Sequence, residues 1–314
     1  MRAISPDGNE DDRMRYYAEG VCSFPQKYTK ESLLCAMHTG AILESRALSY
    51  DSAGNLHFKL GGFDALMPHC ECADGVEEGR VHEVALMTRV GRAVCFVITA
   101  VCMNAPEPYF LLSRAQAQRR CAQEYLNAFI PGDVLRCRIT HLEPFGAFCD
   151  VGCGIAALLP IDCLSVSRIA SPADRVRVGQ DLPCIVKARD AQNRLVLSLK
   201  ELYGSWQENA ALFSAGDTVV GIVRSTEPYG VFVELRPNLA GLAETELNFA
   251  RGQAVSVYIK SILPDKMKIK LVILHALDAE SMPCILPAVP DFTHLDHWIY
   301  STPQSSRVLE TVFE

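Results

Sequence analysis

The most conspicuous group of potential metal ligands in this sequence is His69-Cys70-Glu71-Cys72. Zinc sites usually combine two such clusters with CxxC-like spacing, and a second half is missing from the sequence. We therefore interpret the cluster as loop residues and expect neither a metal nor another cofactor. The motifs GxxxxGK[ST], GxGxxG and GxSxG do not occur in a suitable context, and the carboxylates form no repeated pair. We predict that the protein is not an enzyme.

Aromatic side chains offer a different kind of chemistry, the stacking of flat rings. The segments EPFGAF at 143–148 and EPYGVF at 227–232 each place two rings around a glycine. Glycine lets the chain turn sharply and lets another strand pass close by, so both rings can face outward. Unpaired bases stack on exposed rings with about 1–3 kcal/mol each. The pattern predicts base stacking, unless one ring of each pair fills the core, by these side chains: Phe145, Phe148, Tyr229 and Phe232.

The alternation of side chains along a strand predicts which way Phe148 points. A period of two places Phe148 and Asp150 on one face of the strand and Cys149 and Val151 on the other. Cys149 and Val151 are the more apolar pair, so we expect them to face the interior. Phe148 should then lie outside.

The two aromatic segments belong to a longer internal repeat. Residues 131–158 and 215–242 align at a constant offset of 84, which pairs Gly132 with Gly216. A weaker copy begins near Gly40, with polar residues where the aromatic hairpin should be and His57 near the place of Phe148. The chain is therefore predicted to contain three related modules, of which the first does not stack bases.

Each module has the period-two pattern of short strands. In the second, Leu135, Cys137 and Ile139 alternate with more polar residues, and the third repeats the pattern. Five short strands in about 70 residues are typical of a small barrel, whose closure removes exposed edges. Apolar residues at helical spacing near 122–129 and 202–213 predict helical connectors. We expect an all-β protein of tandem five-stranded barrels joined by short helices.

Basic side chains are expected beside the rings. The second module offers Lys187, Arg189 and Arg194 on its fourth and fifth strands, and the third offers Lys260, Lys266, Lys268 and Lys270. The alternation around Ile269 should point Lys268 and Lys270 outward. A merely solvated strand face is the alternative interpretation.

The repeated pattern resembles the S1-type RNA-binding domain. The resemblance rests on Gly132-Asp133, EPFGAF, Ala157-Leu158, Gly179-Gln180 and Leu197-Ser198, and on their counterparts up to residue 274. It implies OB-fold barrels that bind single-stranded RNA, with Asp190 and Arg194 among the contacts. Many members of the family carry a histidine where this chain has Pro160 and Glu244, and a glutamate there would repel phosphate.

These patterns suggest five segments along the 314 residues. We assign them as a leader at 1–30, a degenerate S1-like barrel at 31–120, S1/OB domains at 121–202 and 203–274, and an acidic tail at 275–314. The tail contains Trp298, Tyr300 and a strand-like VLETVF, so we expect it to fold onto the last barrel. The alternative is a flexible terminus.

Charge and hydropathy bound the function. The net charge is −7, but the modules at 129–202 and 213–274 are close to neutral and compatible with binding single strands. The longest apolar run, at 93–103, is about half of a membrane span, and an export signal is not evident. We expect a cytoplasmic, translation-associated protein that binds single-stranded mRNA or rRNA, with the small ribosomal subunit as a partner and no membrane. The alternative is a scaffold whose barrels dock on ribosomal or RNA-processing proteins.

Overall fold

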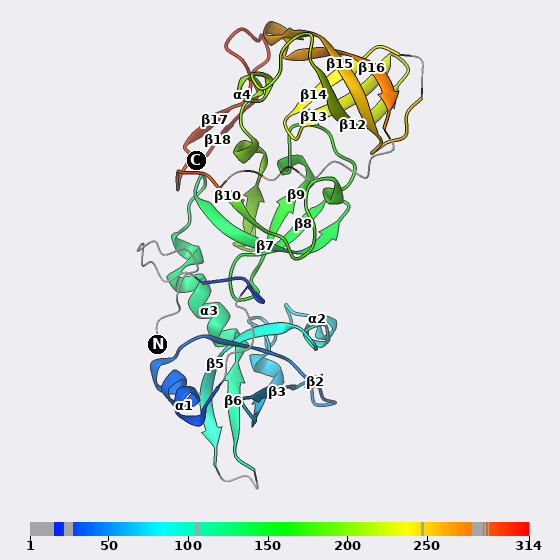
Figure 1. The fold of residues 1–314 in the computed structure, drawn as a ribbon. Helices are drawn as coiled ribbons and strands as arrows, with labels where there is room; N and C mark the ends of the chain where they lie inside the picture. Colours follow the sequence, from blue (N-terminus) through cyan, green and yellow to red (C-terminus); the bar gives the residue numbers. More distant parts are fainter. Residues whose placement is uncertain are drawn as a thin grey trace. The chain divides into compact units, whose positions relative to one another are not determined.

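The structure is a computed structural model that describes residues 16–21, 28–103, 107–245, 248–277, 285, 287 and 289–313. The chain divides into two compact units, coloured along the sequence in Figure 1. The first comprises Met1–Phe129 and Val151–Ile155, and the second comprises Ile130–Asp150 and Ala156–Glu314. The predicted leader at 1–30 lies largely outside the described residues. In the described part of the chain, no helix is long and apolar enough to cross a membrane.

The first unit is built on a curled six-stranded sheet in the order β1-β5-β6-β4-β3-β2. Its strands are β1 (Leu43–Arg46), β2 (Ser49–Tyr50), β3 (Leu56–Leu60), β4 (Phe63–Met67), β5 (Ala93–Cys102) and β6 (Tyr109–Ser113). Its helical segments are α1 (Lys30–Thr39), η1 (His69–Glu71), α2 (Glu83–Met87), α3 (Arg114–Glu124) and η2 (Leu126–Ala128). Neighbouring strands are antiparallel except for the parallel pair β4–β6.

The sheet of the first unit is not closed because its first strand is interrupted. Ala47 and Leu48 separate β1, which pairs with β5, from β2, which pairs with β3. Ala47 is fully buried and its N–H still donates to the carbonyl of Arg92, whereas the N–H of Leu48 donates to the carbonyl of His57, so the chain changes partner between these two residues. The expected first barrel is thus a curled sheet with its first strand divided between the two sheet edges.

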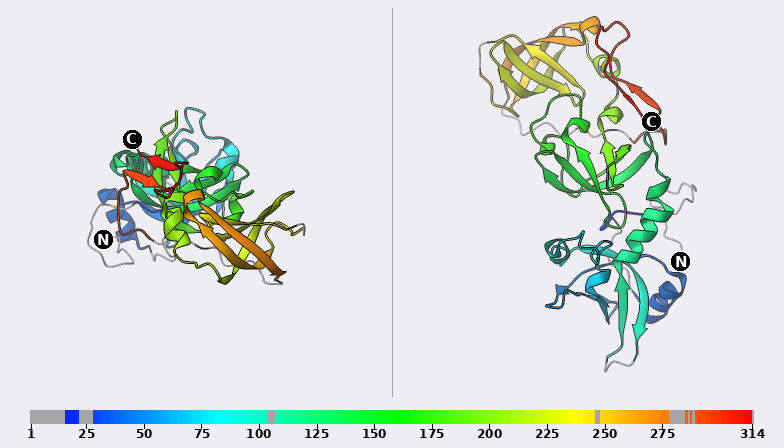
Figure 2. Two further views of the ribbon diagram at one scale, coloured as in Figure 1. Left: turned by 90° about the horizontal axis from the view of Figure 1, so that it is seen from above. Right: turned by 180° about the vertical axis from the view of Figure 1, so that it is seen from behind.

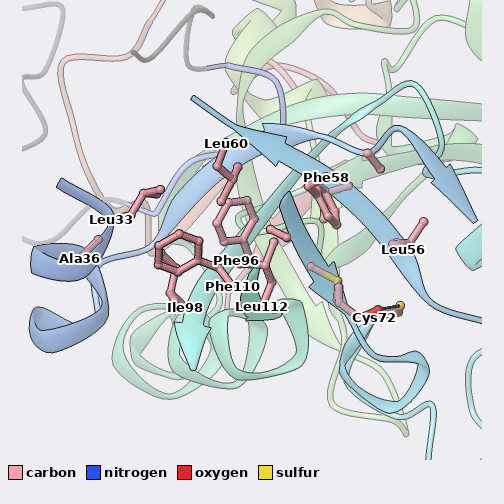
Figure 3. Close-up of a cluster of buried hydrophobic side chains, with 14 of the residues drawn as sticks. Leu33, Ala36, Leu56, Phe58, Leu60, Cys72, Phe96, Ile98, Phe110 and Leu112 are labelled. Carbon is pink, nitrogen blue, oxygen red and sulfur yellow. Dashed lines mark hydrogen bonds between the residues drawn. The ribbon is translucent and has the colours of Figure 1, made fainter. Parts of the chain in front are cut away.

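A continuous apolar core fills the first unit. Phe58 and Phe96 meet at a ring-centroid distance of 5.8 Å, and Leu33 and Ala36 of α1 pack against the same cluster (Figure 3). Helix α1 begins at Thr29, whose hydroxyl accepts from the N–H of Ser32 in a capping box. The cap fixes where the apolar side of this helix meets the sheet.

The second unit contains two closed five-stranded barrels, which confirms the predicted all-β fold of tandem barrels. Barrel two consists of β7 (Val134–Glu143), β8 (Gly146–Asp150), β9 (Ala156–Pro160), β10 (Asp181–Arg189) and β11 (Leu195–Ser198). Barrel three consists of β12 (Thr218–Glu227), β13 (Gly230–Arg236), β14 (Leu239–Ala243), β15 (Ala254–Leu263) and β16 (Lys268–Ala276). The other segments of this unit are η3 (Ile161–Cys163), η4 (Pro172–Asp174), η5 (Lys200–Tyr203), α4 (Trp206–Ala210), η6 (Pro264–Lys266), β17 (His297–Ile299) and β18 (Glu310–Val312).

The helical connectors exist but differ in extent from the sequence pattern. The α-helix before barrel two ends at Glu124, and a short 3-10 turn follows it. Before barrel three, Gly204 separates η5 from α4, because its positive φ of 79° ends the 3-10 turn. Ser205 then caps α4 through the N–H of Glu208, and Phe213 lies beyond the helix.

Buried polar groups join the two barrels of the second unit. Glu234 of barrel three accepts from Arg224 at 2.9 and 3.0 Å and from Arg175, which follows η4 of barrel two. Arg175 and Glu234 are almost completely buried, and a fully buried Asn238 donates to the carbonyls of Lys200 and Gly204 at 2.7 and 2.9 Å. Because these buried groups of the two barrels hydrogen-bond to one another, polar contacts specify the arrangement of the two barrels.

The C-terminal segment contacts both barrels. Trp298 and Tyr300 are buried in the apolar cluster of barrel three, and the Tyr300 hydroxyl donates to the carbonyl of Asn238 at 2.7 Å. Strands β17 and β18 form a separate two-stranded ribbon beside α4 (Figures 1 and 2). Upstream of the ribbon, His294 forms a β-bridge with Asp133 of barrel two. The described part of the tail is therefore ordered by packing on the barrels.

Candidate nucleic-acid interface

The hairpin between β7 and β8 presents the two rings of barrel two. Phe145 is 54% exposed at the turn and Phe148 is half-buried on β8, and their centroids lie 6.1 Å apart at an interplanar angle of 90°. Cys149 and Val151 are buried, as the alternation predicted, whereas Asp150, which the alternation placed outside with Phe148, is buried as well. A Cβ on Gly146 would lie 2.5 Å from the carbonyl oxygen of Leu159. Glycine is required here because strand β9 passes so close.

Barrel three repeats this geometry with a tyrosine. The centroids of Tyr229 and Phe232 are 6.2 Å apart at 89°, and Tyr229 is 63% exposed. Gly230 has a φ of 144°, and a Cβ at this position would lie 2.5 Å from the carbonyl oxygen of Ala243. Beside Tyr229 lies an open hollow of about 550 Å³, lined by Pro228, Tyr229, Leu242, Glu244 and Thr245. The two hairpins are therefore equivalent in the fold as well as in the sequence.

Strand register places each half-buried ring in a row of outward side chains. In barrel two the row runs from Phe148 through Leu158 to Val196 across β8, β9 and β11. In barrel three it runs from Phe232 through Leu242 to Lys270. Directly paired residues project to the same face of a sheet, so barrel three brings a cation into line with its ring and barrel two does not.

The lysines of barrel three fulfil the expected geometry. Lys268 and Lys270 are exposed on either side of the buried Ile269, and Lys260 is exposed on β15. Lys270 lies 3.9 Å from Glu244, measured between Nζ and Oε1. The carboxylate of Glu244, which we expected to repel phosphate, thus lies beside the ammonium group of Lys270, which neutralises its charge.

The charged residues of barrel two are arranged differently from the expectation. Lys187 donates from Nζ to the buried Sγ of Cys163 at 3.2 Å, so its ammonium group points to the protein. Arg194 lies in the turn before β11 rather than on the strand, and its Nε contacts Oδ2 of Asp190 at 2.7 Å. The backbone N–H of Arg194, together with its side chain, holds the pKa of Asp190 below its usual value. The pair stabilises the turn beside the interface.

In the first unit, His57 occupies the position of Phe148. His57 pairs with Leu66, as Phe148 pairs with Leu158, and the parallel neighbour Leu111 corresponds to Val196. The His57 ring contacts Asp51 at 2.9 Å, and Asp51 also accepts from two backbone N–H groups in the turn. These hydrogen bonds keep the pKa of Asp51 well below its ordinary value. This sheet therefore has a hydrogen-bonded turn in place of the aromatic pair.

Two residues of the interface were missed by reasoning from the sequence. His141 is exposed and pairs directly with Phe148, and Leu158 carries the row from β8 to β9. The repeat itself contained a signal for Leu158, because it aligns with Leu242 at the offset of 84. The suspected ligands at 69–72 do not converge: Glu71 accepts from Ser113, and the thiol of Cys72 is buried. Among the described residues, no group of three or more His, Cys, Asp or Glu side chains is placed to hold a metal ion.

The fold and site define a tandem OB-barrel protein with an aromatic hairpin on each closed barrel. Residues 128–200, which include barrel two, match the model of the S1 RNA binding domain. The chain therefore carries an S1-type RNA-binding domain, as the sequence resemblance implied.

Curated relatives are ribosomal proteins of bacteria. The small ribosomal subunit protein bS1 homolog of Bacillus subtilis (strain 168) is 38% identical over 122 residues, covering 38% of this chain and 32% of that protein. The small ribosomal subunit protein bS1 of Streptococcus pneumoniae (strain ATCC BAA-255 / R6) is 30% identical over 186 residues, covering 54% and 46%. The chain thus spans about a third to a half of the length of these relatives.

A solved structure covers more of the chain at lower similarity. It is described as a multidomain protein with nucleic acid binding domains from Streptococcus pneumoniae TIGR4. It is 14% identical and covers 74% of this chain and 73% of its own, with a TM-score of 0.24.

Proposed function

We propose that the chain binds single-stranded RNA on the outer faces of barrels two and three. The observation that carries this proposal is the repetition of one exposed aromatic pair with the same spacing and the same perpendicular ring geometry. Exposed rings at equivalent positions of two barrels are suited to stacking unpaired bases, which contributes about 1–3 kcal/mol per base. The match of residues 128–200 to the S1 RNA binding domain supports the same ligand.

Barrels two and three would contribute differently to binding. Barrel three aligns Lys270 with Phe232 and has Lys260 and Lys268 nearby, so it can contact both phosphate and base. Barrel two aligns its ring with Leu158 and depends more on stacking. Since both barrels belong to one compact unit, an RNA strand that is bound by one barrel is at a high effective concentration for the other.

The cellular role that fits this binding is in translation. The relatives from Bacillus subtilis and Streptococcus pneumoniae are small ribosomal subunit proteins. We infer that the RNA is mRNA or rRNA, that the small ribosomal subunit is a partner, and that the protein acts in the bacterial cytoplasm. Binding and positioning of RNA, without catalysis, account for the features of the site.

The proposal is tested by fluorescence anisotropy with a labelled, unstructured RNA of about 32 nucleotides, long enough for two OB barrels at up to about 16 nucleotides each. Phe145→Ala with Phe148→Ala, and separately Tyr229→Ala with Phe232→Ala, should each raise the Kd by at least the roughly 5- to 150-fold expected for the loss of one stacked base. Phe292→Ala serves as the matched control, because Phe292 is an exposed phenylalanine outside both hairpins.

Two results would overturn this function. The first is RNA affinity that none of the ring substitutions alters. The second is a variant that lacks both aromatic pairs and still binds purified small ribosomal subunits as tightly as the wild type does. This result would favour a protein scaffold.

A further inference from the structure

The outer face of the fourth and fifth strands can be compared between modules at one fixed position. Each fourth strand has a bulge, and the second cross-strand pair before this bulge projects outward in every module. This pair is Val97↔Ser113 in the first unit and Ile185↔Ser198 in barrel two. All four side chains are buried, with exposures between 0 and 4%. In both modules something covers the outside of the sheet here.

The cover is the helical segment that follows the fifth strand. Ser113 caps α3, accepting from the N–H of Gln116 at 2.9 Å, and α3 lies along β5. Ser198 donates to the carboxylate of Glu201 in η5, which contacts β10. In each case a serine ends the strand and starts the segment that turns back over it.

Barrel three lacks this arrangement. The equivalent pair is Tyr258↔Val272, so valine replaces the serine, and β16 continues as a strand to Ala276. Tyr258 is 39% exposed, Val272 44% and Leu274 51%. Within the described residues this face has no helical cover. With Val220 of the neighbouring β12, also exposed, these side chains form what we call the open strand face.

Lysines border the open strand face. Lys260 follows Tyr258 at a bulge of β15, and Lys268 and Lys270 precede Val272 on the same side of β16. All three are exposed. A partner that covers the apolar side chains would therefore meet positive charge at its edge, and like charge there would be repelled.

We propose that the open strand face of barrel three docks an acidic amphipathic helix of a partner protein. A helical segment covers the same position in the other two modules. An apolar helix face fits Tyr258 and its partner Val272, with Leu274 further along β16 and Val220 on β12, where the direct partner of Val220 is the buried Ser256. Acidic residues on the helix would complement the bordering lysines. Tyr258 and Val272 lie outside the row that contains Phe232, so the apolar contacts of the helix are separate from RNA stacking, whereas the bordering lysines are the ones that barrel three also offers to phosphate.

Two synthetic helices of about 18 residues are suitable probes for the full chain. Both carry the same leucine and alanine face, and their polar face is glutamate in one and lysine in the other. By anisotropy, the glutamate helix should bind at least about tenfold more tightly than the lysine helix. Tyr258→Thr with Val272→Thr should weaken it by about tenfold or more, the loss expected on removing central apolar contacts. Threonine keeps a strand-compatible shape, and Val178→Thr, at an exposed valine of barrel two, is the matched control.

Four outcomes would overturn the proposal. In the first, the wild type binds the glutamate and lysine helices equally well, and in the second, the double variant binds the glutamate helix as tightly as the wild type. In the third, the wild type is a dimer that the double substitution abolishes. In the fourth, the double substitution lowers the RNA affinity as much as Tyr229→Ala does. Unchanged thermal unfolding of the double variant shows that it is folded, and Leu274→Thr provides a second variant of the same face. Loss of RNA binding by wild-type protein would refute the proposed function but leave helix docking intact.

Discussion

Replacing Phe148 with alanine separates base stacking from core packing. The ring is half-buried on the outer side of β8, edge-on to Phe145 and paired across strands with His141 and Leu158. Loss of one stacked base costs about 1–3 kcal/mol, which raises the Kd for single-stranded RNA about 5- to 150-fold. Loss of the edge-to-face contact costs about 0.5–1.5 kcal/mol of stability. With the partly buried ring area added, the total should stay below the 3–5 kcal/mol typical of emptying a phenylalanine site in a core.

The adjacent residue supplies the matched comparison. Cys149 is completely buried and points into barrel two, so Cys149→Ala should lower the free energy of unfolding without changing the RNA affinity of the folded protein. Urea unfolding and anisotropy titration on the same preparations measure both quantities. A core-sized stability loss for Phe148→Ala, with no loss of RNA affinity in the folded fraction, would refute the outward stacking role.

Three further predictions concern charges. Glu234→Gln should cost about 3–5 kcal/mol in urea unfolding, because it leaves the buried guanidinium group of Arg175 without its carboxylate and leaves Arg224 with Asp174 alone, and an unchanged midpoint would contradict this. The hydrogen bond to Asp133 raises the pKa of His294, so the contribution of His294 to stability is complete below the unfolded pKa near 6.5 and disappears as pH rises through the folded pKa. The difference in Tm between the wild type and His294→Gln should therefore shrink from about pH 5.5 to about pH 8.5. A difference in Tm that grows over this range would contradict the prediction. The three exposed lysines of barrel three should give log Kd a slope of about 2 against log salt, whereas RNA binding that is independent of ionic strength would exclude them as phosphate contacts.

Most of the structure that could be predicted from the sequence was predicted from the internal repeat. The offset of 84 aligned both hairpins, and alternation along β8 was enough to place Phe148 outside and Cys149 inside. The reason is that a closed barrel has only two faces, and a period of two assigns every strand residue to one of them. The same logic placed Lys268 and Lys270 correctly.

What the sequence could not provide depends on contacts between distant residues. Arg175 and Glu234 are 59 positions apart, and neither lies in a motif that marks it as buried. The sequence pattern predicts that Lys187 points outward, but its ammonium group donates a hydrogen bond to the buried Sγ of Cys163. No glycine or proline marks the interruption after Ala47, where the chain changes from the hydrogen bond of Ala47 to Arg92 to the hydrogen bond of Leu48 to His57.

The bridge between residues 293–296 and barrel two has a consequence for the order of events during synthesis. Val134 donates its N–H to the carbonyl of Thr293 at 2.9 Å, and Leu295 donates to the carbonyl of Gly132 at 3.0 Å. These contacts span about 160 residues, although barrel two itself needs nothing beyond β11 to close. Domains generally fold as units while the chain emerges, N-terminal ones first. Barrel two therefore leaves the ribosome closed but with these backbone groups still solvated, and it acquires their final partners only after all of barrel three has been translated.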